Sequence, residues 1–346
     1  MIIEVRTPAR AGLIGNPSDG FGGVTISFTF DAFCATARLW ESPELDIRPS
    51  QRDRATFESL DDLVQNVQND GYYGGVRLIK AAIKVFCDYC QRLGIELERK
   101  NFTISYDTDI PSRVGLAGSS AIVTSVMRAL MRYYGVTIPK QILPNLVLSA
   151  ESDELLIGAG LQDRVAQVYG GLTYMDFGEE YMRRGFGHYE NLDATLLPPL
   201  FIAYDATSSE GTEVVHNPLR ERYQKGEALV ADTLSQIASN ARKFRQALEE
   251  GDLDEMYRLM DANFDLRCQI QQINPLHRRL VNVARRVGAC CKFCGSGGAV
   301  IGIYRDEEMY RDLEEAYAKI SVPLLKPHVV EYPELGPHAT HSPKPR

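Results

Sequence analysis

The sequence predicts a protein of mixed α and β structure that folds into two lobes. Its 346 residues exceed the roughly 250–300 residues at which a single hydrophobic core stops growing. Strand-like segments dominate the first third, whereas long helical patterns open the second part. Residues 178–199, rich in charge, glycine and proline, separate the two parts. We therefore expect an N-terminal lobe over residues 1–177, a hinge over 178–199 and a C-terminal lobe over 200–332.

The expected N-terminal lobe contains both kinds of pattern. Runs rich in β-branched and aromatic residues predict strands over residues 2–5, 24–28, 32–39, 101–106 and 171–177. Apolar residues at helical spacing predict helices over residues 76–93, 119–134 and 142–156. This lobe should therefore place helices behind a β-rich layer.

The expected C-terminal lobe is mostly helical. Helical patterns cover residues 213–249, 253–273, 276–287 and 307–319, and strand-like runs cover 200–205, 300–304 and 324–330. Residues 333–346 contain prolines and histidines without an apolar pattern, which predicts a disordered tail.

Composition and charge exclude several classes of function. Hydrophobic residues make up 44% of the chain and charged residues 24%, as in ordinary globular proteins. The net charge of −8 argues against a nucleic-acid binder, which usually shows a basic face. No apolar run approaches the ~20 residues that span a bilayer, and the N-terminus lacks the basic-then-apolar pattern of a secretory signal. We expect a cytoplasmic protein without nucleic-acid or membrane partners, while its oligomeric state, including a homo-oligomer, stays open.

Seven cysteines include two pairs at C-x-x-C spacing, which together could offer four thiolates to zinc. However, Cys87 and Cys90 lie within an apolar helical pattern, where cysteine commonly acts as a small core residue. Cys291 and Cys294 adjoin a glycine-rich turn. Free thiols are therefore expected rather than a zinc site.

Residues 111–121 carry the strongest local signal. This stretch of glycines and serines follows an apparent strand and leads directly into a helix-compatible segment. The first N–H groups and the positive dipole end of a helix bind anions, and glycine lets a phosphate approach the backbone. Serine is also a preferred helix cap, and the stretch is neither a Walker A loop nor GxGxxG. On this loop alone, phosphate binding and simple helix capping both remain open.

Residues 9–20 are a second candidate. Here Arg10 could offset phosphate charge, and Asp19 could form hydrogen bonds with sugar hydroxyls. The same segment ends in Asn-Pro-Ser-Asp-Gly, which favours an ordinary turn without any ligand.

Two later segments are also candidates. Glu151 and Asp163 lie twelve residues apart around a glycine-containing loop, so that one could bind magnesium while the other faces a nucleophile. Acidic residues at helix ends are more often simply solvated. Residues 288–299 form a glycine-rich turn that includes Lys292, and this turn could be a plain β-turn.

Taken in this order, the four segments resemble the GHMP superfamily of small-molecule kinases, which includes galactokinase, homoserine kinase, mevalonate kinase and phosphomevalonate kinase. The superfamily's phosphate loop has the pattern P-x-x-x-G-L-x-S-S-A. Its residues occur here in the same order, with one additional residue between Leu116 and Ser119: Pro111, Gly115, Leu116, Ser119, Ser120 and Ala121. Residues 12–19, 69–78, 145–151 and 160–171 are similar to the glucuronokinases of plants within this superfamily. The resemblance implies an α+β fold of two lobes with the active site in the cleft between them.

The resemblance also implies the roles of individual residues. It assigns nucleotide phosphates to Pro111, Gly115, Leu116, Ala117, Gly118, Ser119, Ser120 and Ala121. It places Mg²⁺ on Ser119 or Ser120 together with Glu151, with ATP as the phosphate donor. Asp163 would accept or orient the proton of the anomeric hydroxyl, and Arg10 would balance charge between Asp163 and the γ-phosphate.

The implied acceptor is D-glucuronate, which would become glucuronate 1-phosphate. The residues expected to bind the sugar are Asp19, Asn16, Tyr72, Arg164 and Gly297. The candidates to face the uronate carboxylate are Arg164, which is adjacent to Asp163, and Arg113 and Arg77. Galactokinase-like enzymes usually have Glu-His where this chain has Asn16-Pro17, which argues against galactose. Galacturonate, a neutral sugar, a heptose or an isoprenoid alcohol remain alternative acceptors, and a non-catalytic ligand sensor remains an alternative of a different class.

Overall fold

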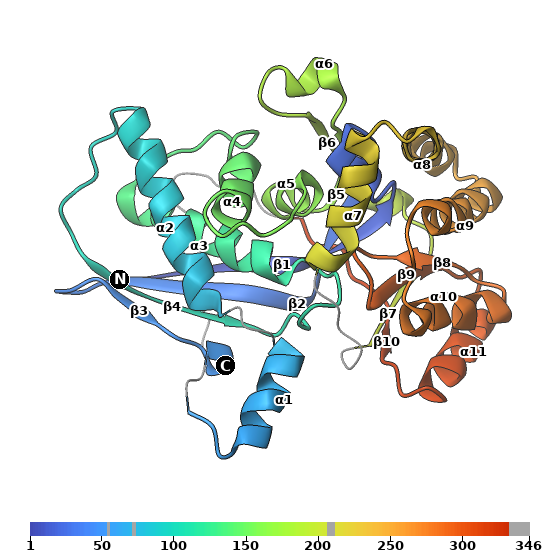
Figure 1. The fold of residues 1–346 in the computed structure, drawn as a ribbon, viewed down its shortest axis with the longest axis horizontal. Coiled ribbons are helices and arrows are strands. Elements are labelled where there is room, and N and C mark those ends of the chain that lie inside the picture. Colours follow the sequence, from blue (N-terminus) through green and yellow to red (C-terminus); the bar gives the residue numbers. More distant parts are fainter. Residues whose placement is uncertain (54–55, 71–73, 206–211, 332–346) are drawn as a thin grey trace.

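The computed structural model describes residues 1–53, 56–70, 74–205 and 212–331 (Figure 1). The predicted tail at 333–346 and the candidate Tyr72 lie outside the described residues. Two β-sheets, each accompanied by helices, make up this part of the chain. The predicted mixture of helix and sheet is confirmed.

The first sheet is built around one long central strand, β2. One side of β2 pairs with β1, and the other side pairs with β5 near its start and with β4 near its end. The predicted strands 24–28 and 32–39 are thus parts of one strand, because a shift in register opposite Pro8 and Ala9 absorbs the polar break at Asp31. Among the described residues the sheet has six strands: β1 (Ile2–Ile14), β2 (Val24–Glu41), β3 (Asp46–Arg48), β4 (Phe102–Thr108), β5 (Leu172–Asp176) and β6 (His188–Leu192).

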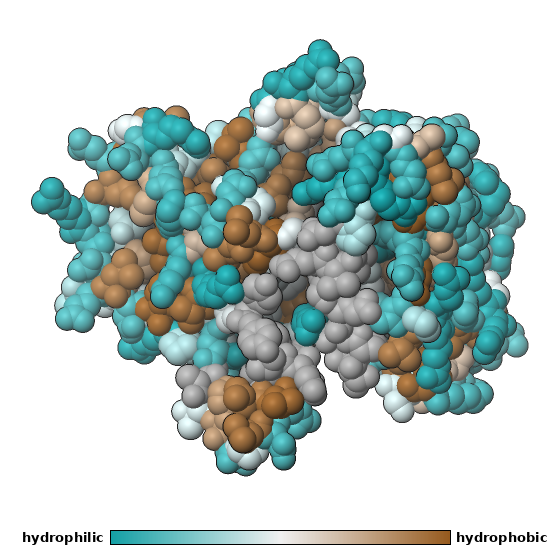
Figure 2. Space-filling model, viewed as in Figure 1, coloured by the Kyte–Doolittle hydropathy of each residue, from teal (hydrophilic) through white to brown (hydrophobic). Residues whose placement is uncertain are grey.

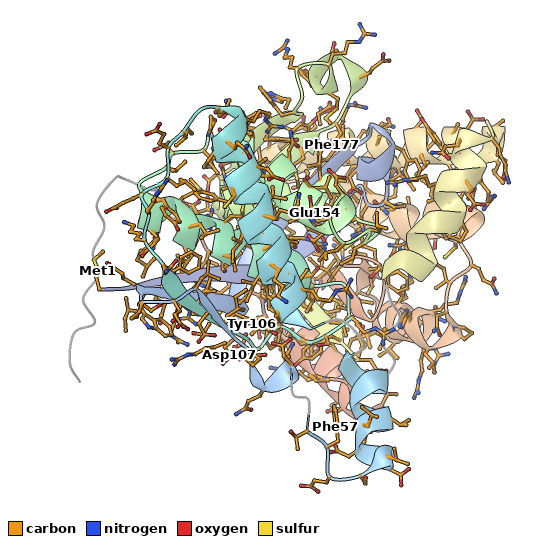
Figure 3. All side chains as sticks on the ribbon, turned by 60° about the vertical axis from the view of Figure 1, so that its left-hand side comes forward. Met1, Phe57, Tyr106, Asp107, Glu154 and Phe177 are labelled. Carbon is orange, nitrogen blue, oxygen red and sulfur yellow. The ribbon has the colours of Figure 1, made fainter. Side chains whose placement is uncertain are left out.

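Four helices pack with this sheet and with one another. The most central is α3, which contacts β1, β2 and three other helices. Every residue from Ser120 to Leu130 is buried, so α3 has no solvated face along this stretch. The hydroxyl of Tyr106 on β4 accepts a hydrogen bond of 3.0 Å from the N-terminal amide of α2 (Figure 3). The helices are α2 (Gly75–Arg92), α3 (Gly118–Tyr134), α4 (Leu143–Ser152) and α5 (Leu161–Tyr169).

A further helix, α1 (Leu60–Asp70), projects from the first lobe on the side away from α2–α5 (Figure 1). Leu60 and Val64 on this helix are largely exposed, and an apolar patch covers α1 in the space-filling view (Figure 2). This helix was not expected from the sequence.

The second sheet is antiparallel, with the order β10-β7-β9-β8. Its strands are β7 (Leu200–Tyr204), β8 (Cys290–Phe293), β9 (Ala299–Ile303) and β10 (Leu324–Leu325). Helices α10 and α11 pack together beside it, and α8 packs against α9. The helices of this half are α7 (Thr212–Gln224), α8 (Ala228–Glu250), α9 (Leu253–Ile270), α10 (Pro275–Val287) and α11 (Glu307–Ala318).

Two sequence predictions of elements need correction. The single helical pattern over 213–249 is interrupted between α7 and α8, where Gly226 adopts a φ of 74° that a continuing helix does not allow. The predicted strand over 324–330 is only the two residues of β10, since Pro327 provides no amide for a ladder.

Residues 178–199, predicted as a hinge, contain regular structure of their own. Helix α6 (Glu179–Met182) leads into β6, which pairs antiparallel with β5 in the first sheet. The chain reaches the second sheet only at Leu200. The boundaries of the two lobes and the hinge remain a prediction.

The end of the described chain returns to the first sheet. The Val330 amide donates to the Thr29 carbonyl over 3.0 Å, and the Thr29 hydroxyl donates to the Val330 carbonyl over 2.8 Å. The Gly171 amide also donates to the Val330 carbonyl, over 2.8 Å. Residues 328–331 therefore form a strap that ties the C-terminal part of the chain to β2 and to Gly171, the residue before β5.

Within the described part of the chain, no helix is long and apolar enough to cross a membrane.

Candidate active site

The two glycine-rich segments, 180 residues apart in sequence, pack backbone against backbone. A Cβ atom on Gly295 would lie 2.5 Å from the carbonyl oxygen of Gly115, closer than real Cβ atoms come to a backbone atom. Gly115 itself has a φ of 76° and faces the carbonyl of Gly297. Glycine is therefore required at Gly115 and Gly295, because any side chain would push the phosphate loop away from the glycine-rich turn.

The phosphate loop, residues 111–121, connects β4 to α3 as predicted. Ala117 precedes the helix with a φ of 64°, and no side chain caps the helix from this position. The first amides of α3 are thus available for an anion at the positive end of the helix dipole.

The structure separates the two serines of this loop. Ser119 is exposed at the first turn of α3, whereas Ser120 is fully buried. The Ser120 hydroxyl donates to Gln167 Oε1 over 2.7 Å, and Gln167 also donates to the Ala117 carbonyl over 2.9 Å. Ser120 therefore fastens the loop to α5, and Ser119 is the serine that faces solvent.

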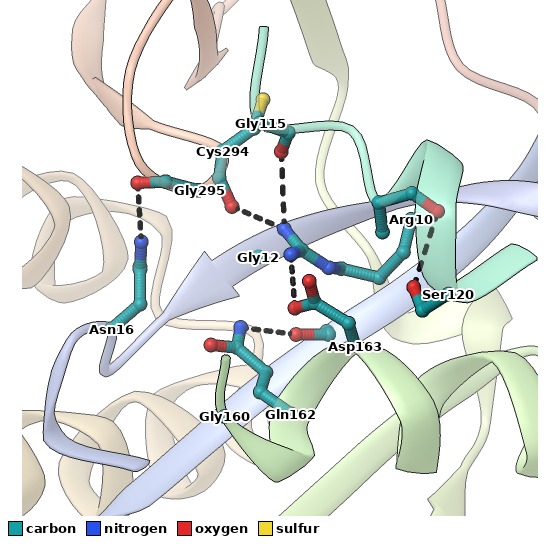
Figure 4. A network of polar contacts seen from close by, with 12 residues as sticks. Arg10, Gly12, Asn16, Gly115, Ser120, Gly160, Gln162, Asp163, Cys294 and Gly295 are labelled. Carbon is teal, nitrogen blue, oxygen red and sulfur yellow. Dashed lines mark hydrogen bonds and ion pairs between the residues drawn. The ribbon is translucent and has the colours of Figure 1, made fainter. Parts of the chain in front are cut away.

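Arg10 connects three of the predicted segments (Figure 4). Its guanidinium forms an ion pair with Asp163 and donates to the carbonyls of Cys294 (2.7 Å) and Gly115 (3.3 Å). Arg10 is 3% exposed, so its charge is balanced by the carboxylate of Asp163 rather than by water. The Arg10 amide also donates to the Leu116 carbonyl over 3.2 Å.

Glu151 on α4 and Arg164 on α5 form a second buried ion pair. Arg164 Nε donates to Glu151 Oε2 over 2.9 Å, and Arg164 Nη1 lies 3.3 Å from Asp163 Oδ2. Burial lowers the pKa of Arg164, but Glu151 and Asp163 outweigh it and the net shift is upward. The other oxygen, Glu151 Oε1, is buried without a hydrogen-bond partner. No hydrogen bond within the described chain joins Glu151 to Ser119 or Ser120.

The loop after β1 faces Asp163. It contains a short 3₁₀ helix, Ser18–Phe21, and the Asp19 carboxylate reaches the backbone of Gly160 so closely that a Cβ there would lie 2.6 Å from Asp19 Oδ2. Burial and the nearby Asp163 charge raise the pKa of Asp19 to about 6, against the opposing influence of Arg10. Asn16 Nδ2 lies 3.4 Å from the carbonyls of both Phe293 and Gly295.

Two further cations lie beneath the glycine-rich turn. Lys292 on β8 is 1% exposed and donates to the carbonyls of Gly12 and Phe293, each over 2.7 Å. Arg267 on α9 is 2% exposed and donates to the carbonyls of Gly295 (2.7 Å) and Ser296 (3.0 Å). Burial lowers the pKa of Lys292 to about 7 and that of Arg267 to about 10. No carboxylate in the described part of the chain is ion-paired with either cation.

Sequence reasoning found most of this site but missed Gln162, Gln167 and Arg267. Gln162 donates to Ser27 Oγ over 2.6 Å, next to Gly12. A signal for Arg267 was present, because it continues the buried face of α9 at helical spacing after Met260 and Phe264. An arginine on such a face is a buried cation that needs a partner.

The predicted residues therefore gather in one place, apart from Tyr72, which lies outside the described residues. Pro111 and Gly118 belong to the loop that carries Gly115, and Ala121 donates to the Ala117 carbonyl within the first turn of α3.

No group of three or more histidine, cysteine or acidic side chains among the described residues could hold a metal by itself. The described cysteines are free, and the buried Cys290, Cys291 and Cys294 have raised pKa values because of burial.

The fold and this site define a class of phosphate-transferring enzymes. Residues 77–171 match the GHMP kinases N terminal domain, and residues 244–319 match the GHMP kinases C terminal domain. The chain belongs to the GHMP kinases, and it is an ATP-dependent phosphotransferase with an alcohol group as acceptor.

Two curated relatives come from Arabidopsis thaliana. The chain is 47% identical over 308 residues to probable glucuronokinase 2, covering 87% of this chain and 84% of that protein. It is 46% identical over 306 residues to glucuronokinase 1, covering 86% of this chain and 84% of that protein.

Solved structures show the same fold at low sequence identity. Galactokinase of Lactococcus lactis in complex with galactose has a TM-score of 0.73 at 14% identity, over 95% of this chain and 94% of that one. Phosphomevalonate kinase of Streptococcus pneumoniae has a TM-score of 0.72 at 16% identity, over 95% of this chain and 100% of that one.

Proposed function

We propose that this kinase transfers the γ-phosphoryl group of ATP to the anomeric hydroxyl of D-glucuronate, forming glucuronate 1-phosphate and ADP. The choice of acceptor is supported by the similarity to the two Arabidopsis glucuronokinases over most of both chains.

The observation that carries the chemistry is the Arg10–Asp163 ion pair, which lies where the phosphate loop, the glycine-rich turn and the Asp19 loop meet. In the proposed reaction the sugar O1–H bond breaks and O1 bonds to the γ-phosphorus, while the bond from that phosphorus to the β,γ-bridging oxygen of ATP breaks. Asp163 accepts or orients the proton that leaves O1. Arg10 stabilises negative charge on the carboxylate and on the phosphoryl group during transfer.

The ends of the substrates are held by different segments in this proposal. The uncapped amides at the start of α3 bind nucleotide phosphates, and Gly115 and Gly295 let the two glycine-rich segments close around them. Asp19 and Asn16 bind the sugar beside Asp163. Catalysis then rests on positioning and on fixed charges, which is how phosphoryl transfer is generally accelerated.

Magnesium fits the donor set of this site. Mg²⁺ in kinases is usually bound by one or two carboxylates together with substrate phosphates, so a dedicated cluster of acids is not needed. The buried and unpartnered Glu151 Oε1 is an oxygen of the required kind, and Ser119 is the exposed serine of the phosphate loop. Glu151 and Ser119 would hold the ion, which would neutralise phosphate charge when bound.

The test is ADP release with ATP and Mg²⁺ against glucuronate, galacturonate, glucose, galactose and mevalonate, with phosphorus NMR to locate the product phosphate. Turnover confined to glucuronate, with the phosphate on C1, is the expected result. Preferred turnover of a neutral sugar or of mevalonate would retain the kinase and reject the proposed acceptor.

A further inference from the structure

A uronate differs from the corresponding neutral sugar by a carboxylate at C6, and an enzyme that binds it must supply a partner for this charge. A carboxylate taken out of water without a partner is costly, so a cation or several hydrogen-bond donors must face it. Which residue of this chain binds the C6 carboxylate is a question that rests on the proposed function.

Arg164, the arginine favoured by its place next to Asp163, is already engaged. Its guanidinium is paired with Glu151 and Asp163 and also donates to the Gly160 carbonyl over 2.9 Å. With two carboxylates bound to one buried cation, a third carboxylate at this position would add repulsion rather than attraction.

Arg267, unlike Arg164, has no carboxylate partner among the described residues. Its three hydrogen bonds all go to neutral acceptors: the carbonyls of Gly295 and Ser296, and Gln271 Oε1 at 2.6 Å. An arginine has five N–H donors, so one N–H on each Nη remains without a partner among the described residues. Each of these two N–H groups can donate to a carboxylate oxygen, and arginine is the side chain that proteins most often use to bind carboxylates.

The position of Arg267 places this charge beside the loop after β1, which carries Asn16 and Asp19. Arg267 and Asn16 both donate toward the same carbonyl, that of Gly295, over 2.7 Å and 3.4 Å. Asp19 acts electrostatically on Arg267, which links the cation to the other end of the loop. Phe293 supports the guanidinium from below, with its ring centre 5.1 Å from the Arg267 Cζ.

The charges of the site leave room for an anion at this point. The carboxylates of Asp163 and Glu151 are each ion-paired with an arginine, whereas Arg267 and Lys292 have no ion-pair partner within the described chain. Burial lowers the pKa of Lys292 to about 7, so only part of the Lys292 side chains are protonated at neutral pH. Arg267 has a pKa of about 10 and is therefore protonated at that pH.

We propose that Arg267 binds the C6 carboxylate of the uronate substrate and thereby sets the preference for uronates over neutral sugars. Asn16 completes this subsite, since its side-chain Oδ1 is buried without a partner and can accept a bond from a neighbouring sugar hydroxyl.

The experiment compares wild type with Arg267→Gln on glucuronate, on its neutral carboxamide glucuronamide and on glucose. The kcat/KM for glucuronate should fall by about 100-fold, in the range seen when a buried charge pair loses one partner. The kcat/KM for glucuronamide and glucose, and the KM for ATP, should change by less than about threefold, because their contacts do not include this charge. Arg279→Gln, an exposed arginine on α10, is the matched control and should behave as wild type.

Calorimetric binding of glucuronate and of ATP provides a second readout. Loss of glucuronate binding with retained ATP binding supports the proposal, even where neutral sugars are turned over too slowly to measure. If Arg267→Gln fails to fold, Arg267→Lys keeps the charge without the fork, and glucuronate affinity should fall by about tenfold while ATP affinity is retained.

Three results would overturn the proposal. Equal losses on all acceptors, or loss of both ligands, would mean that Arg267 only holds the glycine-rich turn in place. Unchanged discrimination between glucuronate and glucuronamide would assign the carboxylate to another group. A wild-type enzyme that binds and phosphorylates only another acceptor would instead refute the proposed function, which is a distinguishable outcome.

Discussion

Arg10 shows how much of this site depends on single residues. Its guanidinium reaches partners 105, 153 and 284 residues away in the sequence: Gly115, Asp163 and Cys294. A buried arginine pays a desolvation cost that is offset only by such directed bonds and by a nearby carboxylate. The same contacts that stabilise Arg10 therefore also hold Asp163 at the meeting point of the phosphate loop and the glycine-rich turn.

The role of Asp163 can be tested by Asp163→Asn. The amide keeps the shape but accepts a proton far less readily and leaves Arg10 without its counter-charge, so kcat should fall by about 10²–10⁴-fold. Nucleotide affinity, measured by calorimetry, should be retained because the loop amides are unchanged. Asp312→Asn on the exposed face of α11 is the control. Turnover of Asp163→Asn close to that of wild type would remove Asp163 from the chemistry.

Lys292 predicts a pH dependence of stability. Its pKa is lowered by burial from 10.5 to about 7, so between these values the unfolded chain binds a proton that the native site excludes. The contribution of Lys292 to the free energy of unfolding is therefore greatest above pH 10.5, declines as the pH falls below that value, and is lost completely once the pH has fallen through about 7.

We expect the free energy of unfolding of wild type, relative to Lys292→Met, to rise by up to about 1.4 kcal/mol per pH unit between pH 7 and pH 9. Urea titrations of the ligand-free proteins at several pH values measure this difference. A difference that stays constant over this interval would show that Lys292 is charged in the native state.

At the scale of elements, the short helix α5 organises the site. Asp163 and Arg164 lie in its first turn, and Gln167 lies one turn later. These three residues point to different partners: Asp163 to Arg10, Arg164 to Glu151 on α4, and Gln167 to Ser120 on α3. The start of α5 is therefore held from three sides, and these contacts keep Asp163 in place.

The ion pair between α4 and α5 should be costly to break from one side. Glu151→Gln leaves Arg164 partly uncompensated in a buried position, and we expect a loss of about 3–5 kcal/mol in the free energy of unfolding. Replacing both partners, as Glu151→Leu with Arg164→Met, should recover most of that loss because no buried charge is left behind. Chemical denaturation of both variants measures this. A double variant less stable than Glu151→Gln would contradict the assignment.

The contact between the two glycine-rich segments makes a separate prediction. Gly295→Ala would place a methyl group 2.5 Å from the Gly115 carbonyl, so the phosphate loop must move. We expect the KM for ATP to rise and kcat to fall, together by about 10²-fold in kcat/KM, as for a misplacement of about 1 Å.

The control is Gly135→Ala at the C-terminal end of α3, where the φ is 65° and a Cβ would meet open space. This variant should lose about 1 kcal/mol of stability through backbone strain but keep its kinetic constants. Equal kinetic effects of the two variants would mean that general destabilisation, rather than the close approach, causes the loss.

At the scale of the whole molecule, the strap of residues 328–331 brings the end of the described chain back to the first sheet. Thr29→Val keeps the shape but removes the hydroxyl that donates to the Val330 carbonyl. Hydrogen exchange should speed up by about tenfold at the strap amides, the effect of losing roughly 1.4 kcal/mol locally, while α10 stays protected. Thr29→Ser, which keeps the hydroxyl, should exchange like wild type. Unchanged exchange in Thr29→Val would show that the strap is held by its backbone bonds alone.

Much of the fold could be predicted because its elements have strong local patterns. Helices α2, α3, α10 and α11 have apolar residues at helical spacing, which can be recognised within the segment itself. The short strands β3, β6 and β8 were not predicted, because so few residues do not show a clear alternation of apolar and polar side chains. Each of them forms by pairing with a neighbouring strand.

The sequence by itself determined the chemical types and their order: a basic residue near the start, a glycine–serine loop before a helix, two carboxylates, and a glycine-rich turn. Only the tertiary structure decided which of these groups meet. In the structure Ser120 is buried and Ser119 is exposed, Glu151 is paired with Arg164, and Arg267 has no carboxylate partner among the described residues. Local patterns encode helices and strands, but contacts between residues more than a hundred positions apart depend on how the layers pack, and packing is a property of the whole chain.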